Sequence, residues 1–213
     1  CLTMRGERVM RWGSIAGLLG VLAFNILFAA SLHLSPEWRF GLDFMSELGL
    51  PGPHAWLFNS ALLVMGISGM LFALGLGQFL AQGSEPEAMG RWSIALLLSG
   101  CVCLALLGVF TMELRAVHDA LAWGFFLLTS MALLLMIFPL TAARRMNDII
   151  VAVTAGTVAV NASCLLLIWT KVLRQHMAEL MVVYALGAWI FLASVLMLKG
   201  LRDRETVTPG TGS

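Results

Sequence analysis

Six long apolar stretches determine what this chain can fold into. Each is about twenty residues long, which is the length an α-helix needs to cross the hydrocarbon core of a bilayer. Polar or Pro- and Gly-containing segments such as QGSEPEAMGR and ARRMND separate them. The stretches lie near 12–33, 55–81, 92–113, 119–141, 149–170 and 177–198. We therefore expect an all-α polytopic membrane protein, a bundle of six transmembrane helices.

The composition agrees with a lipid environment and excludes several functions. Hydrophobic residues make up 60% of the chain, charged residues only 12%, and the mean hydropathy is +0.91. A soluble domain of 213 residues has too little interior for this much apolar surface. The net charge of +1 and the lack of a basic run longer than Arg144–Arg145 argue against nucleic acid as a partner. The sequence has no CxxC motif, which argues against dithiol chemistry and covalently attached haem.

Basic residues predict the orientation, because Lys and Arg near span ends are retained on the cytoplasmic side. With the N-terminus inside, the cytoplasmic set is Arg5, Arg8, Arg11, Arg91, Arg144, Arg145, Lys199, Arg202 and Arg204. The smaller outer set is Arg39, Arg115, Lys171 and Arg174. We expect a multi-pass protein of the cell (inner or plasma) membrane with both termini cytoplasmic. A single transmembrane domain would cover 1–200, followed by a small, polar and disordered cytoplasmic tail over 201–213.

The segment DFMSELG, between the first two spans, concentrates polar groups in an apolar chain. Asp43, Ser46 and Glu47 are spaced i, i+3, i+4, which on a helix places all three on one face. Gly49 and the following Pro and Gly residues end such a helix. We therefore expect a short amphipathic interfacial helix between the first and second spans, with His54 opening the second span.

Further acids and imidazoles fall on the same outer side. Polar groups at this depth are costly unless they pair, reach water or bind a ligand, so their convergence predicts a functional site. The predicted ligand-binding residues are Asp43, Ser46, Glu47, His54, His118, Asp119 and Glu179. The structural alternative is that the acids are solvated and that Ser46 or Asp119 caps a helix. Within the spans, Asn25, Asn59 and Asn161 are expected to hydrogen-bond between helices.

Three segments of the outer side resemble the landmarks of a known family. They are DFMSELG, GVFTMELRAVHDALAWGFF and HMAELMVVYALGAWI. They are similar to segments of the bacterial and archaeal membrane proteins grouped as domain of unknown function 998 (DUF998). The matching positions are Ser46, Glu47, Leu48, Gly49, Gly108, Phe110, His118 and Glu179. The resemblance implies six-helix architecture and no established activity. Many members have Pro after the Gly-(Ile/Val)-Phe motif where this chain has Thr111, so a proline kink cannot be carried over.

Three functions fit these observations, and whether the protein is an enzyme is left open. The first is binding or regulating a membrane lipid or other small amphiphile at the outward-facing polar site, with Met-rich grooves holding the apolar part. The second is an accessory subunit that binds other membrane-protein subunits. The third is a metal-dependent lipid hydrolase or transferase. A divalent metal would then be the cofactor, with His54, His118 and Asp119 as ligands and Glu47 or Ser46 as catalytic groups. A transporter is disfavoured because no span carries a charge at its centre.

The orientation can be tested directly. We expect a reporter enzyme that is active only outside the cytoplasm to remain inactive when it is fused to either terminus. Fused within the segment 35–54, the same reporter should be active, because four basic residues face outward and nine inward in the expected topology. Activity at either terminus would contradict the orientation.

Overall fold

A computed structural model describes residues 4–81, 88–142 and 148–207, and all regular structure within these ranges is helical. Six helices in this part of the chain are long and apolar enough to cross a membrane, which confirms the expected fold class. The elements are α1 (Met4–Leu34), η1 (Met45–Gly49), α2 (Ala55–Leu80), α3 (Ala88–Leu107), η2 (Met112–Leu114), α4 (Arg115–Ala142), α5 (Asp148–Trp169) and α6 (Gln175–Val207). The two η elements are short 3₁₀ helices.

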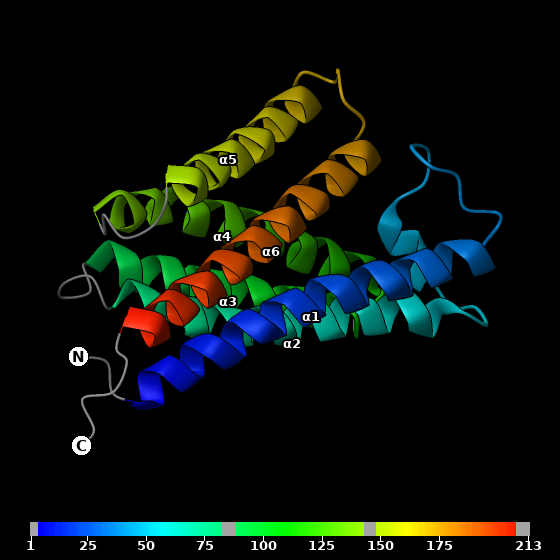
Figure 1. Cartoon of the computed structure of the whole chain (residues 1–213). Coiled ribbons are helices and arrows are strands. Elements are labelled where there is room, and N and C mark those ends of the chain that lie inside the picture. The colour runs from blue at the N-terminus through cyan, green and yellow to red at the C-terminus, as the bar shows by residue number, and fades with distance from the viewer. Residues whose placement is uncertain (1–3, 82–87, 143–147, 208–213) are drawn as a thin grey trace.

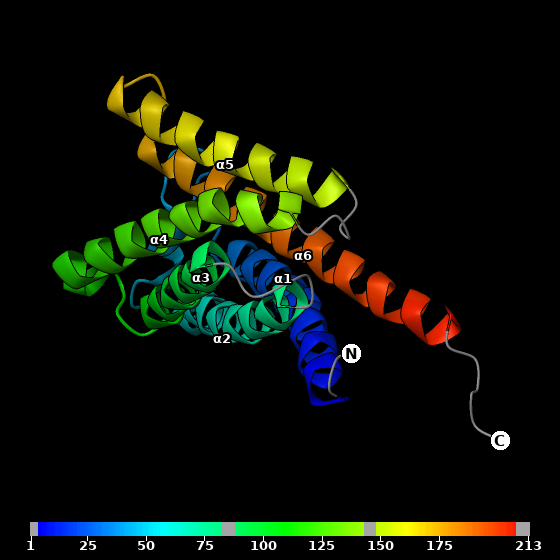
Figure 2. The ribbon, with the colours of Figure 1, turned by 90° about the vertical axis from the view of Figure 1, so that its left-hand side faces the viewer.

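The helices form a ring in chain order. Each packs against its sequence neighbours, and α6 closes the ring by packing against α1 (Figures 1 and 2). Helix α5 lies at the outer edge and packs mainly against α4 and α6. The connections α1–α2, α3–α4 and α5–α6 all lie at one end of the bundle, which we call the loop end, and both termini lie toward the other (Figure 1).

The third span is shorter than expected, because the chain leaves the helix after Leu107 instead of continuing to residue 113. Gly108 lies directly against the backbone of α2, where an added Cβ would be only 2.5 Å from the Asn59 carbonyl oxygen. Thr111 is extended, with φ −71° and ψ 172°, and η2 follows it. The turn therefore forms without proline at position 111.

The last helix is longer than expected. Helix α6 continues to Val207, and Leu201 is only 5% exposed. Helix α6 therefore extends beyond the predicted domain boundary at residue 200, over residues that were expected to belong to the tail. Residues 208–213 lie outside the described residues.

Close backbone contacts hold the first three helices together. A Cβ added to Gly13 of α1 would lie 2.8 Å from the Cα of Gly75 in α2. A Cβ added to Gly66 of α2 would lie 2.5 Å from the backbone nitrogen of Ala105 in α3. Small residues replace large side chains at these crossings, as is typical of helix pairs in membranes, where lipid supplies no hydrophobic drive for association.

A matched pair of glycine substitutions tests this packing. We expect Gly66→Ala to lower the free energy of unfolding by about 1–3 kcal/mol, because the added methyl group forces α2 and α3 apart. Gly156→Ala in α5 is the control, since an added Cβ there meets nothing within 4 Å. Thermal unfolding in detergent measures both variants, and equal melting temperatures would contradict the assignment.

Candidate functional site

The connection between α1 and α2 folds back onto the loop end through η1. A 3₁₀ helix has three residues per turn, so side chains at i and i+3 lie above one another. Met45 and Leu48 are accordingly buried together, at 2% and 6% exposure, and Ser46 is also buried. Glu47 is half-buried, and Asp43 precedes the helix. The expected single polar face of Asp43, Ser46 and Glu47 is therefore wrong, because the 3₁₀ period and the later helix start separate the three residues.

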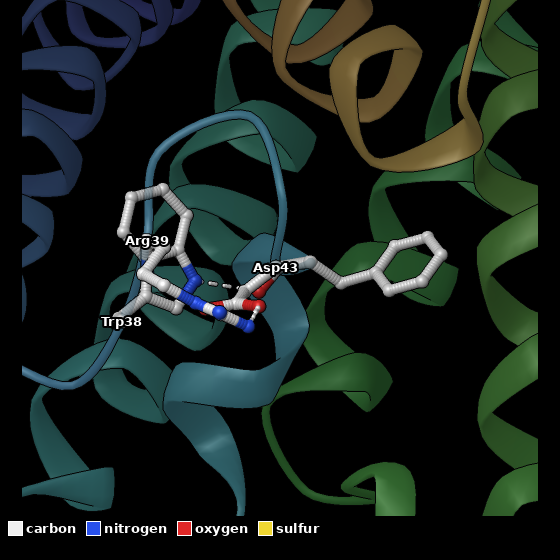
Figure 3. Close-up of polar contacts among 4 residues, drawn as sticks. Trp38, Arg39 and Asp43 are labelled. Atoms are coloured by element: carbon white, nitrogen blue, oxygen red, sulfur yellow. Dashed lines mark hydrogen bonds and ion pairs between the residues drawn. The ribbon is translucent and has the colours of Figure 1, made fainter.

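Asp43 instead holds the loop that precedes η1. Its carboxylate accepts hydrogen bonds from the backbone N–H of Arg39 at 2.7 Å and from the Arg39 guanidinium at 3.1 Å (Figure 3). The indole N–H of Trp38 donates to the Phe44 carbonyl at 2.8 Å. The side-chain hydrogen bond from Arg39 is the main cause that holds the pKa of Asp43 below its ordinary value of 3.8. Asp43 thus organises the connection through hydrogen bonds from Arg39 and also interacts electrostatically with His176 of α6.

Glu179, near the start of α6, fastens η1 to the bundle. The backbone N–H of Met45 donates to Oε2 of Glu179 at 3.0 Å, across 134 residues of sequence. The hydroxyl group and the backbone N–H of Ser46 also donate hydrogen bonds to this carboxylate. Three donors from η1 therefore converge on one carboxyl group and tie η1 to α6. The first and third sequence landmarks therefore meet at one half-buried carboxylate.

Asn59 of α2 joins the first and second landmarks. Its side-chain amide donates to the Gly49 carbonyl at 3.2 Å, and its backbone carbonyl lies against Gly108. A Cβ on either glycine would collide with Asn59, so both positions need a residue without a side chain. The sequence marked Asn59 as a helix-packing residue and not as part of the site.

His118 of α4 is 5% exposed, and its Nδ1 lies 2.9 Å from the Phe110 carbonyl oxygen. A carbonyl oxygen only accepts, so Nδ1 carries the proton in this contact. When the ring is neutral, Nε2 is then a hydrogen-bond acceptor. Phe110 and His118 belong to the same landmark, and the Phe110 backbone carbonyl orients the His118 ring.

Two cavities meet at these residues. The apolar cavity, of about 320 Å³, lies inside the ring between α1, α2, α3, α4 and α6 and extends along α6 to Leu192. The polar cavity, of about 280 Å³, lies between α4, α5, α6 and η1. Five residues line both cavities, namely Ser46, His118, Ala122, Phe126 and Glu179. The wall between the cavities is therefore the place where the three landmarks converge.

The predicted ligand-binding residues divide into two groups. Ser46, His118 and Glu179 line both cavities, and Asp119 lines the polar one. Asp43, Glu47 and His54 line neither. Glu47 does lie close enough to Glu179 to interact with it electrostatically. His54 is the residue before α2 and makes no side-chain capping hydrogen bond.

The predicted metal ligands are not gathered. The described ranges contain no group of three or more His, Cys, Asp or Glu side chains that could hold a metal ion. Asp119 instead lies 3.7 Å from Arg115, one helical turn away, in an exposed ion pair. The physical reason is that His54, His118 and Asp119 project from the starts of two different helices in different directions, so only His118 faces the convergence of the landmarks.

Two buried polar residues, His176 and Asn161, lie outside the predicted set of ligand-binding residues. His176 is only 8% exposed, and its ring packs edge-on against Phe44. Its Nε2 has no hydrogen-bond partner among the described residues. Asn161 was expected to join helices and does so, because its amide donates to Ser130 Oγ at 2.8 Å. Its Oδ1 has no partner within the described structure. Asn25 bonds only to the Val21 carbonyl of its own helix.

This geometry defines a multi-pass membrane protein of six helices, with a polar site at the loop end above an apolar cavity. The chain belongs to the family described as "Protein of unknown function (DUF998)", which matches residues 15–196 and so includes all three landmarks. The resemblance inferred from the sequence is confirmed. In the same comparisons, no curated protein and no solved structure matched the chain.

The role of Glu179 can be measured by truncation. Glu179→Ala removes the acceptor of hydrogen bonds from Met45 and Ser46, each worth about 1.5–3 kcal/mol when one partner is charged. We expect faster amide hydrogen exchange across residues 45–49 and a lower melting temperature. Glu47→Ala removes a neighbouring half-buried carboxylate that lines neither cavity, and it should leave both quantities nearly unchanged. Equal effects of the two variants would contradict the anchoring role.

The Arg39–Asp43 contact predicts a pH dependence. The pKa of Asp43 is lowered on folding, so its stabilising contribution is complete above 3.8 and is lost as the pH falls through the lower folded value. We expect the indole N–H resonance of Trp38 to shift in this acidic range, because the loop that positions Trp38 loosens. The step should be missing in Asp43→Asn. A step of the same midpoint in both proteins would assign the titration to another group.

Proposed function

We propose that this protein binds a lipid or other small amphiphile in the apolar cavity, with the polar group of the ligand at Ser46, His118 and Glu179. The observation that carries the proposal is the polarity gradient of one cavity. Its loop end has a hydroxyl, an imidazole and a carboxylate, and its remaining wall consists mostly of Leu, Phe, Met and Val side chains from five helices.

The dimensions of the cavity suit such a ligand. From Glu179 to Leu192 the lining follows α6 for thirteen residues, which corresponds to about 20 Å at 1.5 Å per residue. A volume of about 320 Å³ lies at the lower end of the range of ligand sites, about 300–1,000 Å³. Met45 and Met65 line the cavity, and their flexible thioethers adapt to irregular apolar ligands.

The charges favour an uncharged head group. Of the Lys, Arg, Asp and Glu side chains in the described ranges, Glu179 is the one that lines the apolar cavity. A phosphate there would face a carboxylate without a compensating cation. Glu179 and the Nε2 of His118 are both acceptors, so the matching head group carries hydroxyl or amide hydrogens. We therefore propose a non-phosphorylated, hydroxyl- or amide-bearing amphiphile.

The proposal also includes the side of the membrane on which the binding site lies. The distribution of Lys and Arg supports a loop end outside the cytoplasm and both termini inside, in the cell membrane. The site would then receive its ligand from the outer leaflet or from the non-cytoplasmic face.

Lipid extraction and mass spectrometry of the purified protein test the binding. We expect one class of amphiphile to be enriched over bulk lipid. Leu104, 8% exposed, lines the apolar cavity, so Leu104→Trp should reduce the enrichment about tenfold or more, equivalent to about 1.4 kcal/mol of lost affinity. Leu71→Trp is the matched control, since Leu71 is 49% exposed. No enrichment over bulk in the parent protein would overturn the proposal.

The head-group chemistry has a separate readout in the same experiment. An enriched species without phosphate supports the acceptor site formed by Glu179 and His118. Enrichment of a phosphate-bearing lipid would retain the binding function and overturn the proposed head group. His118→Leu should lower the enrichment of the hydroxyl-bearing species selectively, because it removes the Nε2 acceptor while keeping an apolar side chain of similar size.

A further inference from the structure

The polar cavity is not explained by an amphiphile that occupies the apolar one. The buried face of helix α5, which borders this cavity and the neighbouring helices, is unusually polar. The buried residues of α5 are Ile150, Thr154, Thr157, Asn161 and Cys164. Three of the five are polar, although in a membrane every buried polar group needs a partner inside the protein or in a water-filled space.

The two threonines have such partners. Thr154 donates to the Ile150 carbonyl at 2.7 Å and accepts from the indole N–H of Trp189 at 2.8 Å. Thr157 donates to the Val153 carbonyl at 2.9 Å. Neither hydroxyl group needs a ligand, and the Thr154–Trp189 hydrogen bond joins α5 to α6.

Asn161 differs from the threonines. Its amide N–H donates to Ser130 Oγ, but its Oδ1 accepts no hydrogen bond within the described structure, although the residue is only 2% exposed. Leaving a buried acceptor unsatisfied costs about 1–3 kcal/mol. Asn161 lines the polar cavity, so a donor placed in that cavity would remove this cost.

The cavity connects this acceptor with the loop end. Its lining begins at the exposed Arg115–Asp119 ion pair, where the side chains are 72% and 51% exposed. It ends at Ser130 on α4 and Asn161 on α5. Asn161 is eight residues before Trp169, the last residue of α5, which places it about 12 Å along the helix from that end. The cavity therefore has polar side chains both at the loop end and at its inner end, with apolar side chains such as Phe126 and Ile168 between them.

We propose that the polar cavity is a second binding site, which takes a small water-soluble molecule with hydroxyl or amino groups that donate to Asn161 Oδ1. The acceptors along the cavity support this chemistry. Besides Asn161 it contains the Glu179 carboxylate and the His118 ring, and the charges of Arg115 and Asp119 at the mouth balance each other. The remaining carboxylate disfavours an anion and favours a neutral or cationic ligand.

The site does not depend on the amphiphile proposed above, because Asn161, Ser130 and Cys164 line the polar cavity alone. The two ligands would nevertheless approach one another. Ser46, His118 and Glu179 form the wall between them, so a head group on one side and a soluble molecule on the other would contact the same three side chains.

Native cysteines allow a matched test of access. Cys164 lines the polar cavity and Cys101 the apolar one, and both are buried, at 2% and 4% exposure. Two variants are compared, each of which retains a single one of the four cysteines. We expect 2-aminoethyl methanethiosulfonate to modify Cys164 at least about tenfold faster than Cys101, because the reactive thiolate forms only in a polar, hydrated site. Equal slow rates would overturn the proposal.

Protection by small molecules tests binding. Glycerol or ethanolamine should slow the labelling of Cys164, by about twofold at a concentration equal to its dissociation constant. Asn161→Leu should abolish the protection while labelling continues, and Asn161→Asp, which keeps an acceptor, should retain protection by ethanolamine. Melting temperatures of the variants confirm folding. If neither glycerol nor ethanolamine slows labelling in the variant that retains only Cys164, the cavity holds water only and the proposal is overturned.

Adding lipid distinguishes a soluble ligand in the polar cavity from the head group of a membrane lipid. Lipids extracted from the host membrane and returned to the delipidated protein should leave the labelling of Cys164 unchanged. If they protect Cys164 and the soluble molecules do not, the polar cavity holds the head group of an amphiphile, and the inference of a second, soluble ligand is wrong. That outcome would leave the lipid-binding proposal standing, so the two proposals fail separately.

Discussion

The arrangement at the loop end depends on one carboxylate. Glu179 accepts hydrogen bonds from η1, a segment 134 residues earlier in the chain, and so fixes the α1–α2 connection on top of α6. Without that contact Ser46 would lose its hydrogen-bond partner at the wall that the two cavities share, and both cavities would lose part of their lining. The cost of holding a carboxylate close to the bilayer is offset by backbone and hydroxyl donors, which is the only way such a group is tolerated there.

The architecture could be predicted well because its cause is local. A run of apolar residues long enough to cross a bilayer becomes a helix whatever its neighbours do, since lipid leaves no other way to satisfy the backbone. The errors lie where tertiary contacts decide. Helix α3 ends early because Gly108 presses against α2, and α6 continues because Leu201 is buried. Neither contact can be read from hydropathy.

The site was predicted in part, and the reason is equally physical. The expected topology places all four histidines and six of the twelve acidic residues at one end, and this can be inferred from their positions relative to the spans. Which of them face inward depends on helix rotation and on the 3₁₀ period of η1. Ser46, His118 and Glu179 turn toward the cavities, whereas Asp43 and His54 serve the connection or the start of α2. Asn59 was not recognised as a site residue, because its role is to position the backbone of two distant glycines.

The glycines divide the ring into two mechanically different parts. Gly13 and Gly75 bring α1 and α2 into backbone contact, and Gly66 does the same for α2 and α3, whereas Gly156, Gly187 and Gly200 of α5 and α6 have no atom within 4 Å of an added Cβ. Helix α5 is joined to α4 and α6 by the buried side chains Ile150 and Cys164 and by the hydrogen bonds of Asn161 with Ser130 and of Thr154 with Trp189. Local opening costs least where close contacts are few, so thermal motion is expected to separate α5 from the ring before it separates α1 from α2. The seam beside α5 is therefore the part of the wall that is expected to yield first.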